Sequence, residues 1–409
     1  MLIELTIALA LSAFTVSIVT LSLSTTYTSV ERTTTLRAQL QTLVKSTQTI
    51  KNLILNETAT TSWKNLSYST PCLVAINAQV LHADTQTLMD YGDDCGGIPI
   101  QQSHSITFKE ITVPNATSLD VLNDHVYVGA LVSSTTEPSL YIFPKDISDT
   151  SQAIKIHLNQ GIRAVDVTQS HMFIAATGTT TQFHIVDIAE PLSATSISKA
   201  TLPGVSGSYP DAISIQYYRS RVYIGTHRTA GREFHIFDVE NPSQPVWLGS
   251  REINHNINDI TVDWPYAYLA TSGNTKDVII LNVSNPSSIL EVSSISFSGN
   301  EDSQKIIRAG DILYIGRKRS TLPQNPEFVM VDSSNPLSPT LITSAYFKST
   351  ITGFCILNSS IYASLTTARN HISKIDVATT SQVMSVPVKE YMQAPKDIDC
   401  EGTTITTLL

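Results

Sequence analysis

The segment FHIFDVENPSQPVWLGSREI, residues 234–253, decides the fold. It begins with a short apolar and aromatic run, FHIFD, which is typical of a buried strand. Asp238 can cap the following turn with its side chain, and Pro242 fixes the next bend. Residues 248–253 predict a further strand. The segment therefore reads as strand, turn and strand, and its signature is structural rather than catalytic.

The same signature recurs along the chain. It reads FHIVD at 183–187, VIILN at 278–282, FVMVD at 328–332 and, more weakly, ISKID at 372–376. A proline follows the Asp or Asn by four residues in four units, as Pro191, Pro242, Pro286 and Pro336. Strands centred on an aromatic residue recur 45–50 residues apart, at Tyr127, Phe173, Tyr223, Tyr268, Tyr314 and Tyr362. Another short apolar strand precedes each, for example at 165–167. Four strands in ~47 residues predict one β-propeller blade.

These units resemble LVIVD-type propeller repeats over about 300 residues. Six units are complete in order, and a seventh, at 396–400 and 404–409, supplies only inner strands. Residues 98–113, with strands expected at 106–108 and 111–113, have the character needed for its outer strands. Joining the two ends of the domain would close the ring and remove exposed edges. The prediction is a seven-bladed propeller over 98–409; six or eight blades would require a different assignment of an end unit.

The first 70 residues differ in character, because no Gly or Pro occurs before Pro71. Residues 1–24 carry a single charge, Glu4, and no Asp, Glu, Lys or Arg occurs from 5 to 30. Such a run can cross a bilayer, which takes ~20 residues, and a carboxylate buried there usually has a partner. Residues 25–55 continue as an amphipathic helix. No base precedes the apolar run, so we expect a basic leader to have been removed from a precursor.

Leu2-Ile3-Glu4-Leu5, followed by an apolar helix, resembles the N-terminus of type IV pilins. The resemblance implies that the helix is inserted in the membrane before assembly and then enters the core of a filament of identical subunits. It also implies a processed, methylated terminus at Met1, with Glu4 paired to the terminal ammonium of a neighbouring subunit. Two features depart from the pilin pattern. The acid lies one residue nearer the terminus, and residues 21–24 replace the proline that kinks the pilin helix.

The predicted fold class is α+β multidomain. A pilin-like helix spans 1–55, with 1–24 as the membrane or filament-core segment, an irregular connector spans 56–97, and the all-β propeller follows. Cys72 and Cys95 are candidates for a disulfide that would close a loop of about 24 residues in the connector. The cluster Asp90, Asp93 and Asp94 either binds calcium or is a solvated acidic turn, and it lacks EF-hand spacing.

Two further cysteines, Cys355 and Cys400, are 45 residues apart and fall on innermost strands of adjacent blades. They form either a disulfide or two buried thiols. An even number of cysteines after an apolar N-terminal segment favours an oxidising, extracytoplasmic location. Candidate glycosylation sequons begin at Asn56, Asn65, Asn115, Asn282 and Asn358, but this composition yields about as many by chance.

Charged residues on or beside the innermost strands are the candidate binding residues: Asp120, Arg163, Asp166, Arg308 and Asp399. They either bind a ligand at a mouth of the channel or bond neighbouring blades. The ten His show no metal spacing, and no Gly-x-Ser-x-Gly elbow or phosphate loop occurs. We therefore predict no catalytic residue, metal or cofactor. A net charge of −9 without a Lys/Arg block argues against a nucleic-acid partner.

Together these features predict a structural subunit of an extracellular, type IV pilus-like filament. The helix would form homo-oligomers in the filament core, and the propeller would be displayed at the cell surface for adhesion or ligand binding. The alternative is a monomeric, membrane-anchored, extracytoplasmic propeller that binds a ligand or protein partner. A third reading, a secreted propeller enzyme, lacks a set of catalytic residues.

Overall fold

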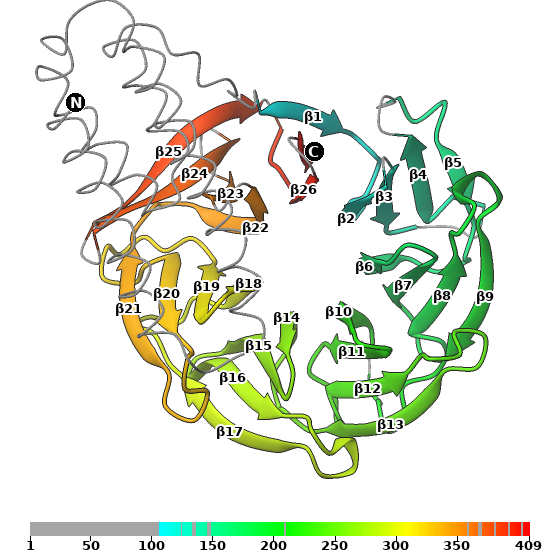
Figure 1. Cartoon of the computed structure of the whole chain (residues 1–409), viewed down its shortest axis with the longest axis horizontal. Coiled ribbons are helices and arrows are strands. Elements are labelled where there is room, and N and C mark those ends of the chain that lie inside the picture. Colours follow the sequence, from blue (N-terminus) through cyan, green and yellow to red (C-terminus); the bar gives the residue numbers. More distant parts are fainter. Residues whose placement is uncertain are drawn as a thin grey trace, which may run out of the picture. The chain divides into compact units, whose positions relative to one another are not determined.

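The computed structural model describes residues 106–409, apart from 124, 133–135, 145–148, 208–209, 358–359, 367–369, 380–381, 392 and 402–403. These residues belong to one compact unit, Ser105–Leu409. In the described part, seven β-sheets are arranged as blades around a central channel (Figure 1). The seven-bladed propeller predicted from the repeats is confirmed.

Blades 1 to 6 are four-stranded and antiparallel, with the strands in sequence order from the channel outward. Blades 1 and 2 comprise β2 (Ala116–Leu122), β3 (His125–Ala130), β4 (Leu140–Pro144) and β5 (Ile154–Ile156), then β6 (Ile162–Val167), β7 (His171–Ala176), β8 (Phe183–Asp187) and β9 (Thr195–Ala200). Blades 3 and 4 comprise β10 (Ala212–Tyr218), β11 (Arg221–Thr226), β12 (Phe234–Asp238) and β13 (Val246–Arg251), then β14 (Ile257–Asp263), β15 (Tyr266–Gly273), β16 (Lys276–Asn282) and β17 (Leu290–Ile295). Blades 5 and 6 comprise β18 (Ser303–Ala309), β19 (Ile312–Arg317), β20 (Phe328–Asp332) and β21 (Thr340–Ala345), then β22 (Thr350–Leu357), β23 (Ser360–Thr366), β24 (Asn370–Thr379) and β25 (Gln382–Tyr391). Short 3-10 helices, η2 (Pro191–Ser193) and η3 (Pro286–Ser288), precede β9 and β17.

The signature strands β8, β12 and β20 are third in their blades, and their first four residues are all buried. Each has a strand on both edges and a neighbouring blade on its faces, so the apolar–polar alternation of a half-exposed strand is lost. Phe183, Phe234 and Phe328 are fully buried there. Burying one such side chain stabilises the fold by about 1.5–3 kcal/mol relative to leaving it exposed. This is why the signature reads as a continuous apolar run.

The ring closes through strands from both ends of the unit. Blade 7 consists of β26 (Asp397–Glu401), β27 (Thr404–Leu408) and β1 (Thr107–Ile111), in the order β1-β27-β26. β1 pairs with β27 in parallel, from Thr107 opposite Thr404 to Ile111 opposite Leu408. Closure by both chain ends is therefore confirmed. The separate strands expected at 106–108 and 111–113 were wrong, because one continuous strand, β1, fills this place; residues 98–105 lie outside the described residues.

The turn chemistry expected after the signature strands is also confirmed for four of the five. The side chains of Asp187, Asp238, Asn282 and Asp332 each accept a hydrogen bond from the backbone N–H two residues later, at 2.8–3.0 Å. The prolines in the following turns contact the preceding blade. Ser198 and Ser293 donate hydrogen bonds to the carbonyl oxygens of Pro242 and Pro336, at 2.7 and 2.6 Å. The Asp/Asn-Pro signature thus shapes a turn and also joins two blades.

Gly249 occupies the position of those two serines in blade 3, opposite Ile236 of β12. A Cβ atom there would lie 1.9 Å from the carbonyl oxygen of Pro286. We expect Gly249→Ala to lower the free energy of unfolding by about 1–3 kcal/mol, because the blades must move apart. Urea denaturation of the purified variant and of the unaltered protein measures this loss of stability. Ser293→Ala is the matched control and should cost only about 1 kcal/mol for its hydrogen bond. An unchanged midpoint for Gly249→Ala would contradict the close packing.

The predicted helix over 1–55, the connector over 56–97 and their residues Met1, Glu4, Cys72, Cys95, Asp90, Asp93 and Asp94 lie outside the described residues. Within the described part of 106–409, no helix has the length and apolar character to span a membrane.

Candidate functional site

A cavity of about 250 Å³ lies in the central channel of the propeller. All seven innermost strands, β2, β6, β10, β14, β18, β22 and β26, contribute to its wall. Its charged lining residues are Asp120, Arg163, Asp166, Asp259, Lys305, Asp397 and Asp399. Four of the five predicted binding residues are therefore brought together. Five carboxyl groups against two cationic side chains give the cavity an acidic, strongly polar wall.

Three of these carboxyl groups occupy one repeat position. Asp120, Asp166 and Asp399 lie on β2, β6 and β26, opposite Tyr127, Phe173 and Thr406 of the next strand. Blades 1, 2 and 7 are consecutive around the closed ring, so the three carboxyl groups form a row, which we call the carboxyl ladder. Gln216, the equivalent residue of β10, follows it in blade 3.

Each carboxyl group of the ladder bonds the next blade. Asp399 accepts a hydrogen bond from the backbone N–H of Val121 at 2.8 Å, and Asp120 accepts one from Val167 at 2.7 Å. Asp166 accepts from the N–H of Tyr217 and from the Gln216 side chain. Of the two roles predicted for these residues, the structure shows the bonding of neighbouring blades. The same residues also line the cavity.

Burial and mutual repulsion raise the pKa values of the carboxyl groups in the ladder. Burial raises the pKa of Asp166 to about 7 and that of Asp399 to about 6. The pKa of Asp120 is raised well above its usual value by burial and by the charges of Asp399 and Asp166 on either side. Burial and these charges favour the protonated form of Asp120, whose side chain lies within hydrogen-bonding reach of Asp399.

Across the cavity, Lys305 of β18 lies between two carboxylates. Its Nζ is 3.4 Å from Oδ1 of Asp397, and Asp259 also favours its charged form. Burial opposes the charge of Lys305, but the two carboxylates outweigh burial and raise its pKa. Asp259 and Asp397 in turn accept backbone hydrogen bonds from Ile306 and Leu119 of the next blades. This second set of inter-blade bonds parallels the ladder.

Asp259, Lys305 and Asp397 were missed in the sequence analysis. The first two follow a register shift in the innermost strand, between 257 and 259 in β14 and between 303 and 305 in β18. Aligning the repeats on their signature strands places both two residues before the ladder position, which is a signal that the sequence contains. Asp397 stands two residues before Asp399 in the same way.

The two predicted arginines differ in placement. Arg163 lines the cavity and forms an ion pair with Asp211 at 3.0 Å. Arg308 is not among the lining residues, since its neighbour Ile307 faces the cavity instead. The Arg308 guanidinium pairs with Asp263 and Asp311 and lies over the ring of Tyr268. Arg308 thus lies outside this cavity, and a role at a channel mouth stays a prediction.

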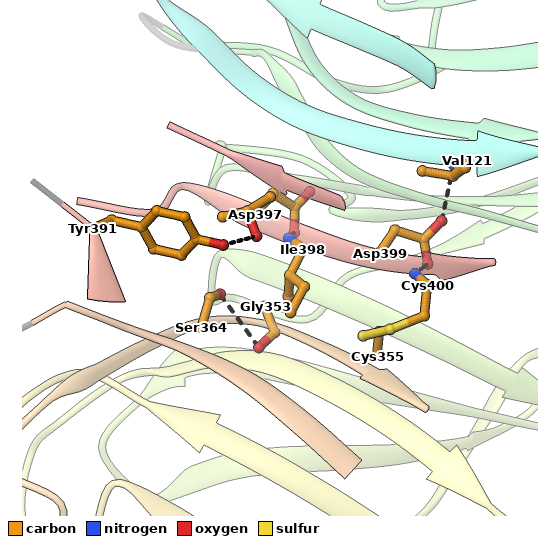
Figure 2. The surroundings of a disulfide bond; sticks show 10 residues. Val121, Gly353, Cys355, Ser364, Tyr391, Asp397, Ile398, Asp399 and Cys400 are labelled. Carbon is orange, nitrogen blue, oxygen red and sulfur yellow. Dashed lines mark hydrogen bonds between the residues drawn. A yellow bond between two sulfur atoms is a disulfide. The ribbon is translucent and has the colours of Figure 1, made fainter. Parts of the chain in front are cut away.

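The cysteine pair joins the last two blades. Cys355 of β22 and Cys400 of β26 form a disulfide, with Cα atoms 5.6 Å apart (Figure 2). Of the two alternatives left by the sequence, the structure shows the disulfide. Figure 2 places the bond beside Asp399, whose carboxylate accepts from Val121 of blade 1. The disulfide and the carboxyl ladder thus hold the two sides of blade 7.

A second repeated feature escaped the sequence analysis. At the start of the third strand of five blades, a buried polar side chain accepts a backbone N–H from the segment that leads into the next blade; it directly precedes the strand in four blades and is the second residue of β16 in blade 4. These side chains are Ser139, Gln182, Glu233, Asp277 and Glu327, with acceptor distances of 2.7–3.2 Å. Their position next to the signature was visible in the sequence. The variation in residue type hid their shared role.

The remaining positions singled out in the sequence are two histidines and the asparagines of the candidate glycosylation sequons. His184 and His235 share a strand position and are buried, and burial lowers the pKa of His235 to about 4. Asn115 is exposed in a turn with φ of 54°, whereas Asn282 caps its own turn. Asn56, Asn65 and Asn358 lie outside the described residues. Among the residues that are described, no group of three or more His, Cys, Asp or Glu is placed to hold a metal ion.

Comparison with known proteins supports the repeats and the fold. The LVIVD repeat family matches residues 256–296 and 303–346, which are blades 4 and 5. No curated protein matches the chain. A solved chain of a mitotic checkpoint complex is 11% identical, with 74% of this chain and 82% of that chain covered and a TM-score of 0.52. A Lactobacillus plantarum protein is 13% identical, with coverage of 72% and 88% and a TM-score of 0.51.

A protein from Bacteroides uniformis, described as a putative 6-phosphogluconolactonase, is 13% identical, with 68% of this chain and 87% of that chain covered and a TM-score of 0.51. At such identities the likeness concerns the fold alone. The described part of this chain is therefore a seven-bladed β-propeller that contains LVIVD repeats.

Proposed function

We propose that this chain is a subunit of an extracellular, type IV pilus-like filament that displays its propeller as a binding module. The N-terminal helix would be inserted in the cytoplasmic membrane before assembly and would then pack with identical helices in the filament core. The observation that carries this proposal is Glu4, the single charge in the apolar segment 1–24, which contains Leu2-Ile3-Glu4-Leu5. A carboxylate in such surroundings calls for a cationic partner.

Two features of the propeller support this proposal. The Cys355–Cys400 disulfide suits an oxidising compartment outside the cytoplasm. The acidic cavity offers carboxyl groups to a cationic or hydrogen-bonding ligand at the centre of a displayed domain. The proposal assigns the propeller recognition or adhesion and no catalytic step.

Substitution of Glu4 tests the filament. We expect Glu4→Gln to leave the protein in the membrane fraction and to abolish filaments in sheared surface material, because the buried acid loses its charge. Glu31→Gln is the matched control, since Glu31 lies beyond the apolar segment 1–24 and should be dispensable. Electron microscopy and fractionation of both variants give the result.

Normal filaments from Glu4→Gln would overturn the proposal. If the unaltered protein yields no fibres and stays wholly with the membrane, the monomeric anchored propeller is the correct reading instead.

A further inference from the structure

The carboxyl ladder lies where the ring closes. β26 and β27 come from the end of the unit, whereas β1 and β2 come from its beginning, so blade 7 meets blade 1 without a covalent link between β26 and β2. Across this junction, the N–H of Val121 of β2 lies 2.8 Å from a carboxyl oxygen of Asp399 of β26 and 2.8 Å from one of Asp120. Two acidic side chains therefore meet at the seam of the ring, where blade 7 joins blade 1.

Each of the four carboxyl oxygens of Asp120 and Asp399 accepts a hydrogen bond from a backbone N–H group. Asp120 accepts from Val121 and Val167, and Asp399 accepts from Cys400 and Val121. The other titratable or charged groups that face Asp120 are Asp397 and Glu401 of β26, Asp166 and Arg163 of β6, Tyr127 of β3 and, across the cavity, Asp259 and Lys305. Arg163 is paired with Asp211, and Lys305 lies beside Asp397 and Asp259. Among the described groups, the two cations near the ladder are thus paired with carboxyl groups outside it.

We propose that the carboxyl ladder is a pH-sensitive latch: the proton that Asp120 shares with Asp399 joins blade 7 to blade 1, and its loss weakens this junction. Without the proton, adjacent carboxylates on consecutive blades repel each other. Blades 4 to 6 carry Thr261, Ile307 and Cys355 at the ladder position, so the effect is confined to the seam and its neighbours.

The direction in which stability changes with pH follows from the raised pKa values of the folded state. An aspartate in an unfolded chain titrates near pH ~4, whereas burial places the pKa of Asp399 at about 6 and that of Asp166 at about 7. The stability that the ladder contributes is therefore complete below pH ~4 and is lost as the pH rises through 6 and 7. Buried histidines act in the opposite sense, because burial lowers the pKa of His184 and His235. A comparison of variants cancels this common background.

Asp120→Asn supplies a neutral side chain of the same shape. The amide nitrogen cannot accept the N–H that one carboxyl oxygen accepts, so we expect the variant to melt below the unaltered protein at pH 5. This difference should shift in favour of the variant by several degrees at pH 8. The measurement uses the full-length chain in non-ionic detergent. Asp238→Asn, at a turn remote from the channel, is the control whose difference from the unaltered protein should not change with pH.

Amide hydrogen exchange of the unaltered protein provides a second readout that needs no variant. The N–H groups of Val121, Val167 and Tyr217 should lose protection several-fold between pH 5 and pH 8, after correction for intrinsic exchange, relative to N–H groups of β16. Asp166→Asn repeats the melting test if Asp120→Asn does not fold. A variant difference that is the same at both pH values, or equal protection of the ladder amides, would overturn the latch.

Discussion

Arg317→Met is expected to lower the free energy of unfolding by about 3–5 kcal/mol, because it leaves a buried carboxylate without its partner. Arg317 ends β19 and is fully buried, and its Nη2 lies 3.3 Å from Oδ1 of Asp277. Its guanidinium also donates to the carbonyl oxygens of Ser298, Pro326 and Glu301 at 2.9–3.1 Å. These contacts connect blade 4, the segment that follows it and blade 5.

Chemical denaturation of three variants separates the ion pair from packing. The double variant Asp277→Asn/Arg317→Met should recover part of the loss, since a neutral amide oxygen can still accept from the N–H of Phe297. Arg319→Met replaces an exposed arginine and should change stability by less than about 0.5 kcal/mol. If Arg317→Met and Arg319→Met prove equally mild, Arg317 does not hold the two blades together.

The second large effect concerns the disulfide. Cys355→Ala/Cys400→Ala should cost about 4 kcal/mol on the chain-entropy model, because the bond closes a loop of 45 residues. Alanine is preferred to serine at these sites, since Cys355 is buried in an apolar cluster and a hydroxyl there would need a new partner. Thermal unfolding under non-reducing conditions gives the comparison.

Reductant provides the control for the cysteine variants. Treating the unaltered protein with dithiothreitol should lower its stability toward that of the double alanine variant, whereas the variant itself should show no change from this bond. Equal stability of the variant and the oxidised protein would mean that the bond contributes nothing to the folded state.

The number of blades and the closure of the ring were predictable because each repeat carries its own local signals. Asp238 caps a turn, Pro242 fixes the bend, and the run of 234–238 must be buried on both faces. None of these depends on contacts distant in the sequence. The same reasoning identified Asp120, Asp166 and Asp399, since one alternation places all three toward the channel.

What escaped prediction depends on contacts between blades. The sequence does not show that Lys305 meets Asp397 of blade 7, or that Arg308 of blade 5 pairs with Asp263 of blade 4. Arg317 stands where blades 1 to 4 have Ala130, Ala176, Thr226 and Thr271, so the repeat pattern predicts a small residue there. Its selection reflects Asp277 on the neighbouring blade, a pairing that becomes visible only in three dimensions.

The parallel pairing of β1 with β27 has a mechanical consequence. Any tension on the chain that precedes Thr107 enters the propeller through β1. Along the strand axis, the five register pairs from Thr107–Thr404 to Ile111–Leu408 bear this load together in shear, instead of opening one after another as in a zipper. From β27 the force passes to β26, which the Cys355–Cys400 bond fastens to blade 6. The strand pairing that completes blade 7 thus also transmits mechanical force into the ring.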